Sequence, residues 1–170
     1  TLAGEWIAAR TVLWAAGVTA SSITGNLGVA LDGVGRVLVN ADLSVPGFSN
    51  IFVIGDAAAI QQQGKWIPGV AQAAIQGGRQ VAANVERLVR GEPTKPFHYV
   101  NLGSLATIGR AAAVANFGRL RFGGFFAWLL WLFVHLMLLV GFRNRLQVIL
   151  EWAWAYFTYQ RSARVIFGEG

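Results

Sequence analysis

Cysteine is absent from this sequence of 170 residues, and histidine occurs only twice. Without a thiol these residues have no disulfide framework, no thiolate metal site and no thiol redox chemistry. The two histidines, His98 and His135, lie far apart and make no metal-ligand pattern. We therefore expect no metal site.

Acidic residues are scarce toward the end of the chain. Residues 110–170 hold seven arginines and two glutamates, a balance of +5, whereas residues 1–109 hold seven basic and six acidic residues, a balance of +1. Four of the seven tryptophans also lie after residue 110. A basic, tryptophan-rich and apolar end is typical of contact with an anionic lipid surface. We expect no nucleic-acid partner, because the arginines are scattered among apolar runs and form no patch.

Formal charge is missing altogether from residues 122–142, a run of 21 residues. That length could cross a hydrocarbon core of about 30 Å. Against a simple span, Gly123-Gly124 weakens its start, and the next apolar stretch, residues 146–157, is too short to return. We expect a helix pair that lies in or dips into one leaflet, with a span as the alternative. His135, at the middle, is expected to be a packed histidine bonded to a carbonyl.

No Gly-x-Gly-x-x-Gly fingerprint follows any predicted strand, and the sequence begins without methionine inside an apolar pattern. We expect it to be part of a longer protein. Residues 7–17 resemble a strand that enters from a preceding fold and ends in Ala15, Ala16 and Gly17. Small residues there permit a ligand to approach closely, although tight packing against a helix explains them equally simply.

The rest of the chain is organised around residues 51–57, Ile-Phe-Val-Ile-Gly-Asp-Ala. Four apolar residues predict a strand buried on both faces, and residues 36–40 predict a shorter one. Asp56 follows at the carboxyl end, where open α/β sheets bind ligands, and its carboxylate could hold a ribose or ribityl hydroxyl. The alternative is an aspartate that only ends the strand and caps a turn.

A long helix is predicted from Ile67-Pro68-Gly69 to about Arg90, where Gly91 stops it. Its first turn has no acidic residue, so its positive end is available to an anion or a polarised carbonyl. Gln72 and Gln76 share one helix face, where they could bond a planar ligand. The alternative is that both amides face solvent.

The composition changes after the linker at residues 92–96, Glu-Pro-Thr-Lys-Pro. Three short spans, residues 97–102, 104–109 and 112–117, alternate or run apolar between glycines. They predict a small antiparallel sheet.

Three blocks together carry a resemblance. Residues 39–58 contain Leu-Ser-Val-Pro-Gly-Phe-Ser-Asn-Ile-Phe-Val-Ile-Gly-Asp, which is similar to the second FAD motif of flavoproteins with two dinucleotide-binding domains. Residues 71–76, Ala-Gln-Ala-Ala-Ile-Gln, match the narrower signature Ala-Gln-x-Ala-x-Gln. Residues 124–145 and 152–158 are similar to a membrane-associating tail. With these blocks the chain resembles the carboxyl-terminal part of type II NADH dehydrogenases, the non-proton-pumping NADH:quinone oxidoreductases.

The resemblance implies roles for particular residues. Asp56 would bond the ribityl chain of FAD, the Ala57 amide would lie near the pyrophosphate, and the helix start would face the flavin. The implied FAD-binding residues are Gly55, Asp56, Ala57, Gly69, Ala71 and Gln72. Ala15, Ala16 and Gly17 would lie near bound NADH, and Gln72 and Gln76 would border the quinone. No side chain need act as an acid or base, because the cofactor carries the chemistry.

The implied fold is an α/β fragment of a Rossmann-like flavoprotein with two dinucleotide-binding domains, followed by a small antiparallel sheet and a helical membrane-associating tail. The segments would be 1–20 (end of the NADH domain), 21–92 (FAD domain), 93–121 (β segment) and 122–170 (tail). The implied partners are a membrane quinone and a bilayer surface, at the cytoplasmic face of a bacterial inner membrane, with a homodimer possible.

Two other functions stay open from the sequence. One is a different FAD-dependent enzyme, such as a sulfide:quinone oxidoreductase, and the other is a non-enzymatic membrane-anchored module. The chain also departs from its relatives where they often carry charged residues, since Val100, Asn101, Leu102 and Ala111 stand there. No lysine role in quinone protonation can be carried over.

Overall fold

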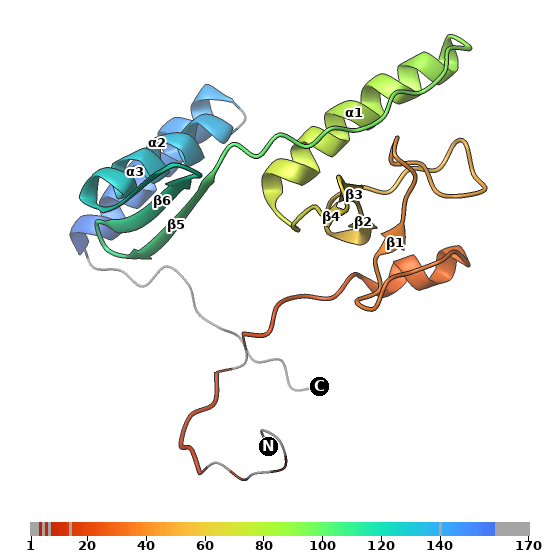
Figure 1. Cartoon of the computed structure of the whole chain (residues 1–170). Coiled ribbons are helices and arrows are strands. Elements are labelled where there is room, and N and C mark those ends of the chain that lie inside the picture. Colours follow the sequence, from red (N-terminus) through yellow and green to blue (C-terminus); the bar gives the residue numbers. More distant parts are fainter. Residues whose placement is uncertain (1–3, 5, 7, 14, 140, 159–170) are drawn as a thin grey trace. The chain divides into compact units, whose positions relative to one another are not determined.

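The computed structural model describes residues 4, 6, 8–13, 15–139 and 141–158. The chain divides into two compact units, Thr1–Asn101 (unit 1) and Leu102–Gly170 (unit 2), and each is described by itself (Figure 1). The boundary between them lies within the predicted segment 93–121. The four predicted domain limits stay predictions.

Unit 1 is built from short strands, two 3-10 helices and one long α-helix. The strands are β1 (Val37–Leu38), β2 (Ala58–Ala59), β3 (Gln61–Gln62) and β4 (Lys65–Trp66), and the helices are η1 (Ser22–Leu27), η2 (Gly55–Ala57) and α1 (Ala71–Val89). β1 and β2 pair in parallel, whereas β3 and β4 form an antiparallel hairpin. Its two loop residues, Gln63 and Gly64, both have positive φ, which suits the right-handed twist of the hairpin.

The core of unit 1 lies between α1 and the short strands. α1 presents Gly77 and Gly78 to the Ile54 side chain, and a Cβ added at either glycine would lie 3.6 Å from an Ile54 carbon. The helix therefore packs closely against the segment that leads into η2. The buried residues of this core are Leu43, Ala58, Ile60, Ile67, Ala73 and Phe97.

The prediction of a long helix that ends before Gly91 is confirmed, but its predicted start at residues 67–69 is wrong, because the chain is still extended at Val70. The helix begins at Ala71 and ends at Val89, and Gly91 follows with a φ of 74°. The Gly91 amide donates to the Leu88 carbonyl at 3.0 Å and the Glu92 amide to the Arg87 carbonyl at 2.8 Å. Paired bonds of this kind end many helices, and they need a residue that tolerates positive φ.

Two strand predictions in unit 1 are wrong. Residues 51–54 are not a buried strand: Phe52 makes an isolated bridge to Ser44, and Ile54 is 37% exposed. The segment meets the turn at residues 43–45, where the Val45 amide donates to the Ile51 carbonyl at 2.8 Å. A strand needs a full neighbouring strand to satisfy its backbone, and this turn offers too little.

The apolar run at residues 7–17 is the second wrong prediction. Ile7 and Trp14 lie outside the described residues, and in 8–13 and 15–17 there is no strand. Leu13 is 88% exposed. Of the other predicted strands in this unit, the one at residues 36–40 is confirmed as β1.

Unit 2 begins with an antiparallel sheet of β5 (Ser104–Gly109), β6 (Ala112–Phe117) and β7 (Leu120–Gly124). Two of the predicted strands are thus confirmed. Residues 97–102 are not the third strand, and β7 takes that place. β7 leads directly into α2 (Phe125–Leu138), which packs on the sheet over a core of Ala113, Ala115 and Ala127 (Figure 1).

Unit 2 contains two helices in the predicted tail, and their place in a membrane leaflet stays a prediction. The uncharged run at residues 122–142 ends β7, forms α2 and then enters α3 (Phe142–Thr158). Arg145, in the first turn of α3, bonds the end of α2: its Nε donates to the Leu139 carbonyl at 2.9 Å and its Nη2 to the Met137 carbonyl at 3.0 Å. A cation is favoured at a helix carboxyl end. Among the helices that the structure describes, none has both the length and the apolar character that crossing a bilayer demands.

Candidate functional site

Asp56 lies in η2, directly before β2. Gly55 has a φ of 64°, and a Cβ added to it would lie 3.4 Å from Ala74 Cβ of α1. A side chain is therefore disfavoured at Gly55 both by backbone conformation and by the helix. This turn directs Asp56 toward the start of α1.

The Asp56 carboxylate lies against Gly69. A Cβ added at Gly69 would lie 3.0 Å from Asp56 Oδ1, which is closer than almost all real Cβ contacts. The absent side chain thus leaves room for the carboxylate beside the backbone that leads into the helix. Both residues are exposed, so ligand atoms can reach them.

The amino end of α1 carries no acidic residue in its first turn, and its N-cap residue, Val70, makes no side-chain cap. The first amides of a helix lack intrahelical partners, and the helix dipole makes this end positive. The binding of an anion or a polarised carbonyl at this end stays a prediction. The arrangement can hold a polar or anionic group between the helix start and the Asp56 carboxylate.

A cavity of about 200 Å³ lies at this place. Gly55, Asp56 and Gly69 line one side of it, and Thr19, Ala20 and Arg36 are among the residues that line the rest. The cavity brings three of the predicted FAD-binding residues together with residues that the sequence did not single out.

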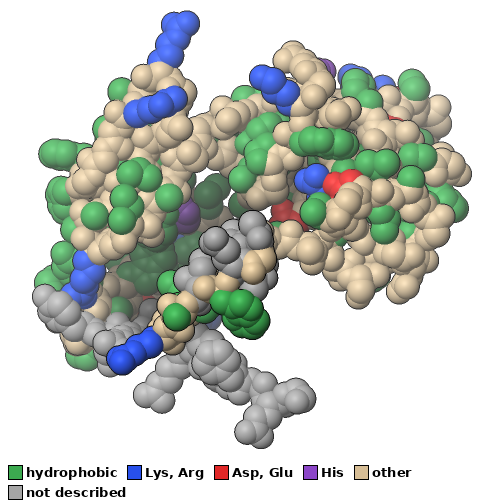
Figure 2. Space-filling view, turned by 60° about the horizontal axis from the view of Figure 1, so that its bottom comes forward, with side chains coloured by type: hydrophobic (Ala, Val, Ile, Leu, Met, Phe, Trp, Pro, Cys, Tyr) green, Lys and Arg blue, Asp and Glu red, His purple; other side chains and the backbone are tan. Residues whose placement is uncertain are grey.

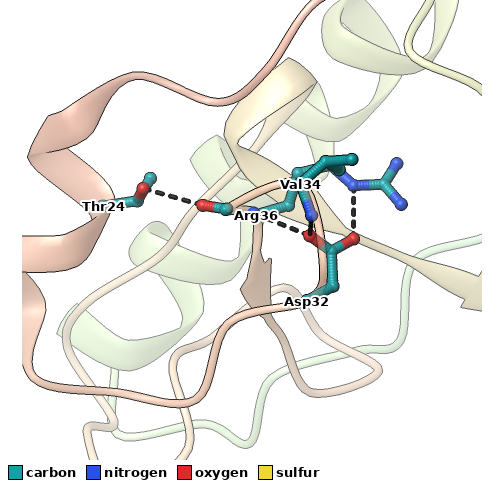
Figure 3. Close-up of polar contacts among 5 residues, drawn as sticks. Thr24, Asp32, Val34 and Arg36 are labelled. Atoms are coloured by element: carbon teal, nitrogen blue, oxygen red, sulfur yellow. Dashed lines mark hydrogen bonds and ion pairs between the residues drawn. The ribbon is translucent and has the colours of Figure 1, made fainter. Parts of the chain in front are cut away.

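A compact loop holds Arg36 at the cavity (Figure 3). Its Nε donates to Asp32 Oδ2 at 2.7 Å, and the amides of Val34 and Arg36 donate to Asp32 Oδ1. Desolvation alone would raise the pKa of the Asp32 carboxyl, but these bonds outweigh it and lower that pKa. The Thr24 hydroxyl donates to the Gly35 carbonyl at 2.8 Å. The loop therefore holds the Arg36 side chain at the cavity as an ion pair with Asp32.

The remaining predicted residues lie in different surroundings. Ala57 ends η2, and Ala71 begins α1. Ala15, Ala16 and Gly17 are exposed and outside regular structure, and none of them lines the cavity. Their role beside NADH stays a prediction, as do the other residue roles.

The side-chain amide of Gln76 is hydrogen-bonded to the backbone of Val100. Its Nε2 donates to the Val100 carbonyl and the Val100 amide donates to Gln76 Oε1, both at 2.9 Å. The amide faces backbone rather than open solvent. Gln72 is half-buried and also has an interaction partner.

Three further carboxamides hold the same extended segment, and the sequence prediction missed them. Gln80 of α1 donates to the Lys95 carbonyl. Gln62 of β3 bonds both backbone groups of Tyr99, and the fully buried Asn84 of α1 bonds both backbone groups of Lys95. The sequence contains one signal of this arrangement. Carboxamide side chains recur every four residues on one face of the helix, at Gln76, Gln80 and Asn84.

The expectation for His135 is confirmed. Its Nδ1 lies 2.8 Å from the Trp131 carbonyl oxygen, and its ring stacks on that of Trp131 with centroids 4.3 Å apart. Within the described part of the chain, no three potential metal ligands of the histidine, aspartate or glutamate type come together.

Two protein-family models match the chain. The NDH2 C-terminal domain matches residues 101–161, and the pyridine nucleotide-disulphide oxidoreductase family matches residues 2–78. The type II NADH:quinone oxidoreductases NdhA and Ndh of Mycobacterium tuberculosis are 44% and 42% identical to it, each over 91% of this chain. The chain belongs to the type II NADH dehydrogenase family. The resemblance drawn from the sequence motifs is thereby confirmed.

Membership of this family implies a dinucleotide-binding flavoprotein fold for residues 2–78. A type II NADH:quinone oxidoreductase of Staphylococcus aureus is 40% identical over 105 residues, which is 59% of this chain and 25% of that protein. The chain spans 34% of the length of each of the two mycobacterial relatives, so it corresponds to about a third of a type II NADH dehydrogenase.

Proposed function

We propose that the full-length protein containing this chain passes two electrons from NADH through FAD to a membrane quinone, without pumping protons. One observation carries the proposal. The Asp56 carboxylate lies against Gly69 at the uncapped, positive start of α1, in a chain of the type II NADH dehydrogenase family. A carboxylate and the positive start of a helix suit the hydroxyl and carbonyl groups of a flavin cofactor.

The residues at the cavity fit FAD. Asp56 would accept hydrogen bonds from the ribityl hydroxyls, with Gly55 and Ala57 allowing the backbone to approach the pyrophosphate. Gly69, Ala71 and Gln72 would place the helix amides beside the flavin ring, where the positive helix end favours negative charge. When bound, FAD supplies the hydride and electron-transfer chemistry. No side chain of this chain is assigned as an acid or base.

Gln72 and Gln76 would border the quinone. The bonds to Val100 use one N–H and one lone pair of the Gln76 amide, and a primary amide has two of each. Gln76 can therefore hold Val100 and still offer one donor and one acceptor to a quinone carbonyl. Ala15, Ala16 and Gly17 would lie beside NADH.

Unit 2 would associate with the membrane, at the cytoplasmic face of a bacterial inner membrane. Its helices expose large apolar side chains such as Phe126, Phe133 and Leu150, and α3 carries the exposed Arg143 in its first turn. Hydrophobic and basic side chains are both visible on the surface of the molecule in Figure 2. This combination favours an interface with anionic lipid. A homodimer stays a prediction.

The test is NADH oxidation by the full-length gene product, with and without a short-chain quinone. We expect visible flavin absorbance in the purified protein and quinone-dependent turnover. A flavin-loaded preparation that oxidises no NADH with quinone would reject the proposal. Turnover with sulfide in place of NADH would indicate the sulfide:quinone alternative, and a preparation that never carries flavin would indicate a non-enzymatic module.

A further inference from the structure

The direction that the Gln76 amide faces is decided by the backbone of Val100. Gln76 Oε1 accepts from the Val100 amide, and Gln76 Nε2 donates to the Val100 carbonyl, both at 2.9 Å. The oxygen and nitrogen of a carboxamide differ little in shape, so their hydrogen-bond partners determine which way the group faces. Turning this amide over would bring two carbonyl oxygens together and two N–H groups together. The Val100 backbone therefore fixes the orientation of the Gln76 amide.

One N–H of Gln76 is left over in this orientation. A pair of bonds to one residue uses the N–H that lies beside the amide oxygen, so the second N–H is directed away from Val100. Among the described residues, the Gln76 amide has no further hydrogen-bond partner. The Gln76 side chain is half-buried, and the Val100 side chain is 59% exposed. A ligand at this face of α1 would therefore meet a hydrogen-bond donor of fixed direction.

The segment that carries Val100 is held by contacts that do not involve Gln76. The Gln62 side chain bonds both backbone groups of Tyr99, the residue before Val100. The Phe97 side chain is buried in the core of unit 1. The position of Val100 thus does not depend on the amide that it orients.

A quinone carbonyl only accepts hydrogen bonds, so it needs a donor in the protein. We propose that Val100 is a positioning residue of the quinone site, whose backbone orients the Gln76 amide so that its remaining Nε2 hydrogen is donated to a quinone carbonyl. This inference rests on the proposed function, in which Gln76 borders the quinone. Only the backbone of residue 100 takes part, so no side-chain motif marks it in the sequence.

The experiment measures oxidation of NADH by the full-length, FAD-loaded protein with a short-chain quinone. Val100→Pro removes the N–H that Gln76 Oε1 accepts, and proline is compatible with an extended segment. We expect the KM for the quinone to rise about fivefold, as the loss of one orienting hydrogen bond implies. The rate with ferricyanide, a small ion that takes electrons from a reduced flavin without a quinone site, should not change.

Val100→Ala and His98→Pro are the matched controls. Val100→Ala keeps the backbone N–H. His98→Pro places the same ring in the same segment, at an exposed residue whose amide has no hydrogen-bond partner in the described part of the chain. Both controls should keep the KM of the unmodified protein. An equal rise in His98→Pro, or no rise in Val100→Pro, would overturn the assignment.

A double variant shows whether Val100 acts through Gln76. Gln76→Leu should raise the KM for the quinone about tenfold by removing the donor. Adding Val100→Pro to it should have no further effect, because the amide to be oriented is then absent. A further fivefold rise in the double variant would show that Val100 acts on the quinone in another way, and the proposal would be rejected.

If Val100→Pro does not fold, deuterium exchange of the peptide that covers residues 97–101 decides. A quinone bonded to Gln76 stabilises the same orientation that bonds Val100, so adding the quinone should slow this exchange. Gln62→Leu should keep the slowing, and Gln76→Leu should lose it. No slowing in the unmodified protein, or equal slowing in Gln76→Leu, would contradict the proposal.

Failure of this inference is distinguishable from failure of the proposed function. An unmodified, FAD-loaded protein that oxidises no NADH with quinone would reject the proposed function. Quinone-dependent turnover that Val100→Pro leaves unchanged would reject only the positioning by Val100.

Discussion

Gln76 and Val100 hold each other by two hydrogen bonds of equal length. The glutamine Nε2 donates to the Val100 carbonyl, and the Val100 amide donates to the glutamine Oε1, each at 2.9 Å. The side-chain amide thereby takes the place of a neighbouring strand. Gln62 does the same for Tyr99, with distances of 3.2 and 2.8 Å. Residues 97–101 are thus extended along α1 without being part of a sheet.

Replacing Gln76 by leucine should loosen this segment at Val100. Two hydrogen bonds are lost, and together they contribute on the order of 1.5 kcal/mol, so the Val100 amide should exchange about tenfold faster with solvent deuterium. Hydrogen exchange with mass spectrometry of peptides that cover residues 97–101 measures this. Gln62→Leu is the matched control, because it should expose the Tyr99 amide instead. Unchanged exchange in Gln76→Leu would show that the two bonds do not hold the segment.

Asn84→Leu should destabilise the protein much more than a change at the neighbouring amide. Asn84 is 0% exposed, and its side chain bonds the Lys95 amide and carbonyl and the Asp42 carbonyl. Leucine would remove the Asn84 partner of the Lys95 amide and of the Asp42 carbonyl, whereas the Lys95 carbonyl would keep its bond from Gln80. The expected cost is about 3 kcal/mol, since each unsatisfied buried group costs roughly 1–3 kcal/mol.

Gln80→Leu is the comparison for Asn84→Leu. Gln80 bonds the Lys95 carbonyl at 3.1 Å near the surface, so its replacement should cost about 1 kcal/mol or less. Thermal unfolding of the purified variants measures both. Equal losses would contradict the role given to Asn84.

Asp42 should make stability depend on pH in the acid range. Burial alone would raise the pKa of this carboxyl, but hydrogen bonds from Ser44 and Thr94, each including a hydroxyl at 2.6 Å, outweigh burial and lower the pKa below its ordinary value of 3.8. A carboxyl with a lowered pKa in the folded state stabilises that state above its unfolded pKa. This stabilisation is lost as the pH falls from about that value through the folded pKa.

The measurement for Asp42 is thermal unfolding at a series of pH values down to the acid limit of solubility. Asp42→Asn should be less stable than the unmodified protein at neutral pH, and the difference should shrink as the pH falls through the range given above. Thr94→Val should reduce the same acid-dependent difference by removing one of the donors. A difference between Asp42→Asn and the unmodified protein that is constant with pH would argue against the lowered pKa.

The local patterns of the sequence predict the long elements well. The end of α1 is predictable because Gly91 follows it, and Pro68 stands three residues before its start at Ala71. The helix pair of unit 2 is predictable because an apolar run ends at Arg143, one residue after the start of α3. These signals act within a few residues, so they need no knowledge of distant partners.

The conformation of residues 51–54, which is not a strand, could not be predicted correctly from such signals. These residues have the composition of a buried strand, but a strand exists only where another strand pairs with it, and the described segment meets a turn instead. The same limit applies to residues 97–101, whose extended backbone is bonded by the side chains of Gln62 and Gln76. Sequence periodicity does not reveal such side-chain partners.

The proposed FAD site was partly predictable. Asp56 and Gly69 were chosen from motifs, and the structure brings them into contact. Arg36 was not chosen, because its position at the cavity depends on the loop that Asp32 closes. A single arginine before a short strand carries no such information.

The contact between Asp56 and Gly69 gives the sharpest test of the proposed cofactor site. Gly69→Ala would place a Cβ 3.0 Å from Asp56 Oδ1 and displace the carboxylate. Gly78→Ala is the matched control, because its Cβ would meet Ile54 at an ordinary 3.6 Å. Within the helix, that control should gain up to about 1 kcal/mol of stability and keep its FAD.

We expect Gly69→Ala and Asp56→Ala each to weaken FAD binding by about tenfold or more, as the loss of a charge-assisted hydrogen bond implies. The double variant should bind FAD no more weakly than Asp56→Ala alone, because Gly69→Ala acts through the carboxylate that is then absent. FAD binding by the two single variants, the double variant and the control Gly78→Ala is measured from the ratio of flavin to protein absorbance during titration with FAD. Full additivity of the two changes would show that Gly69 affects the cofactor independently of Asp56, and normal FAD binding by Asp56→Ala would remove Asp56 from the site.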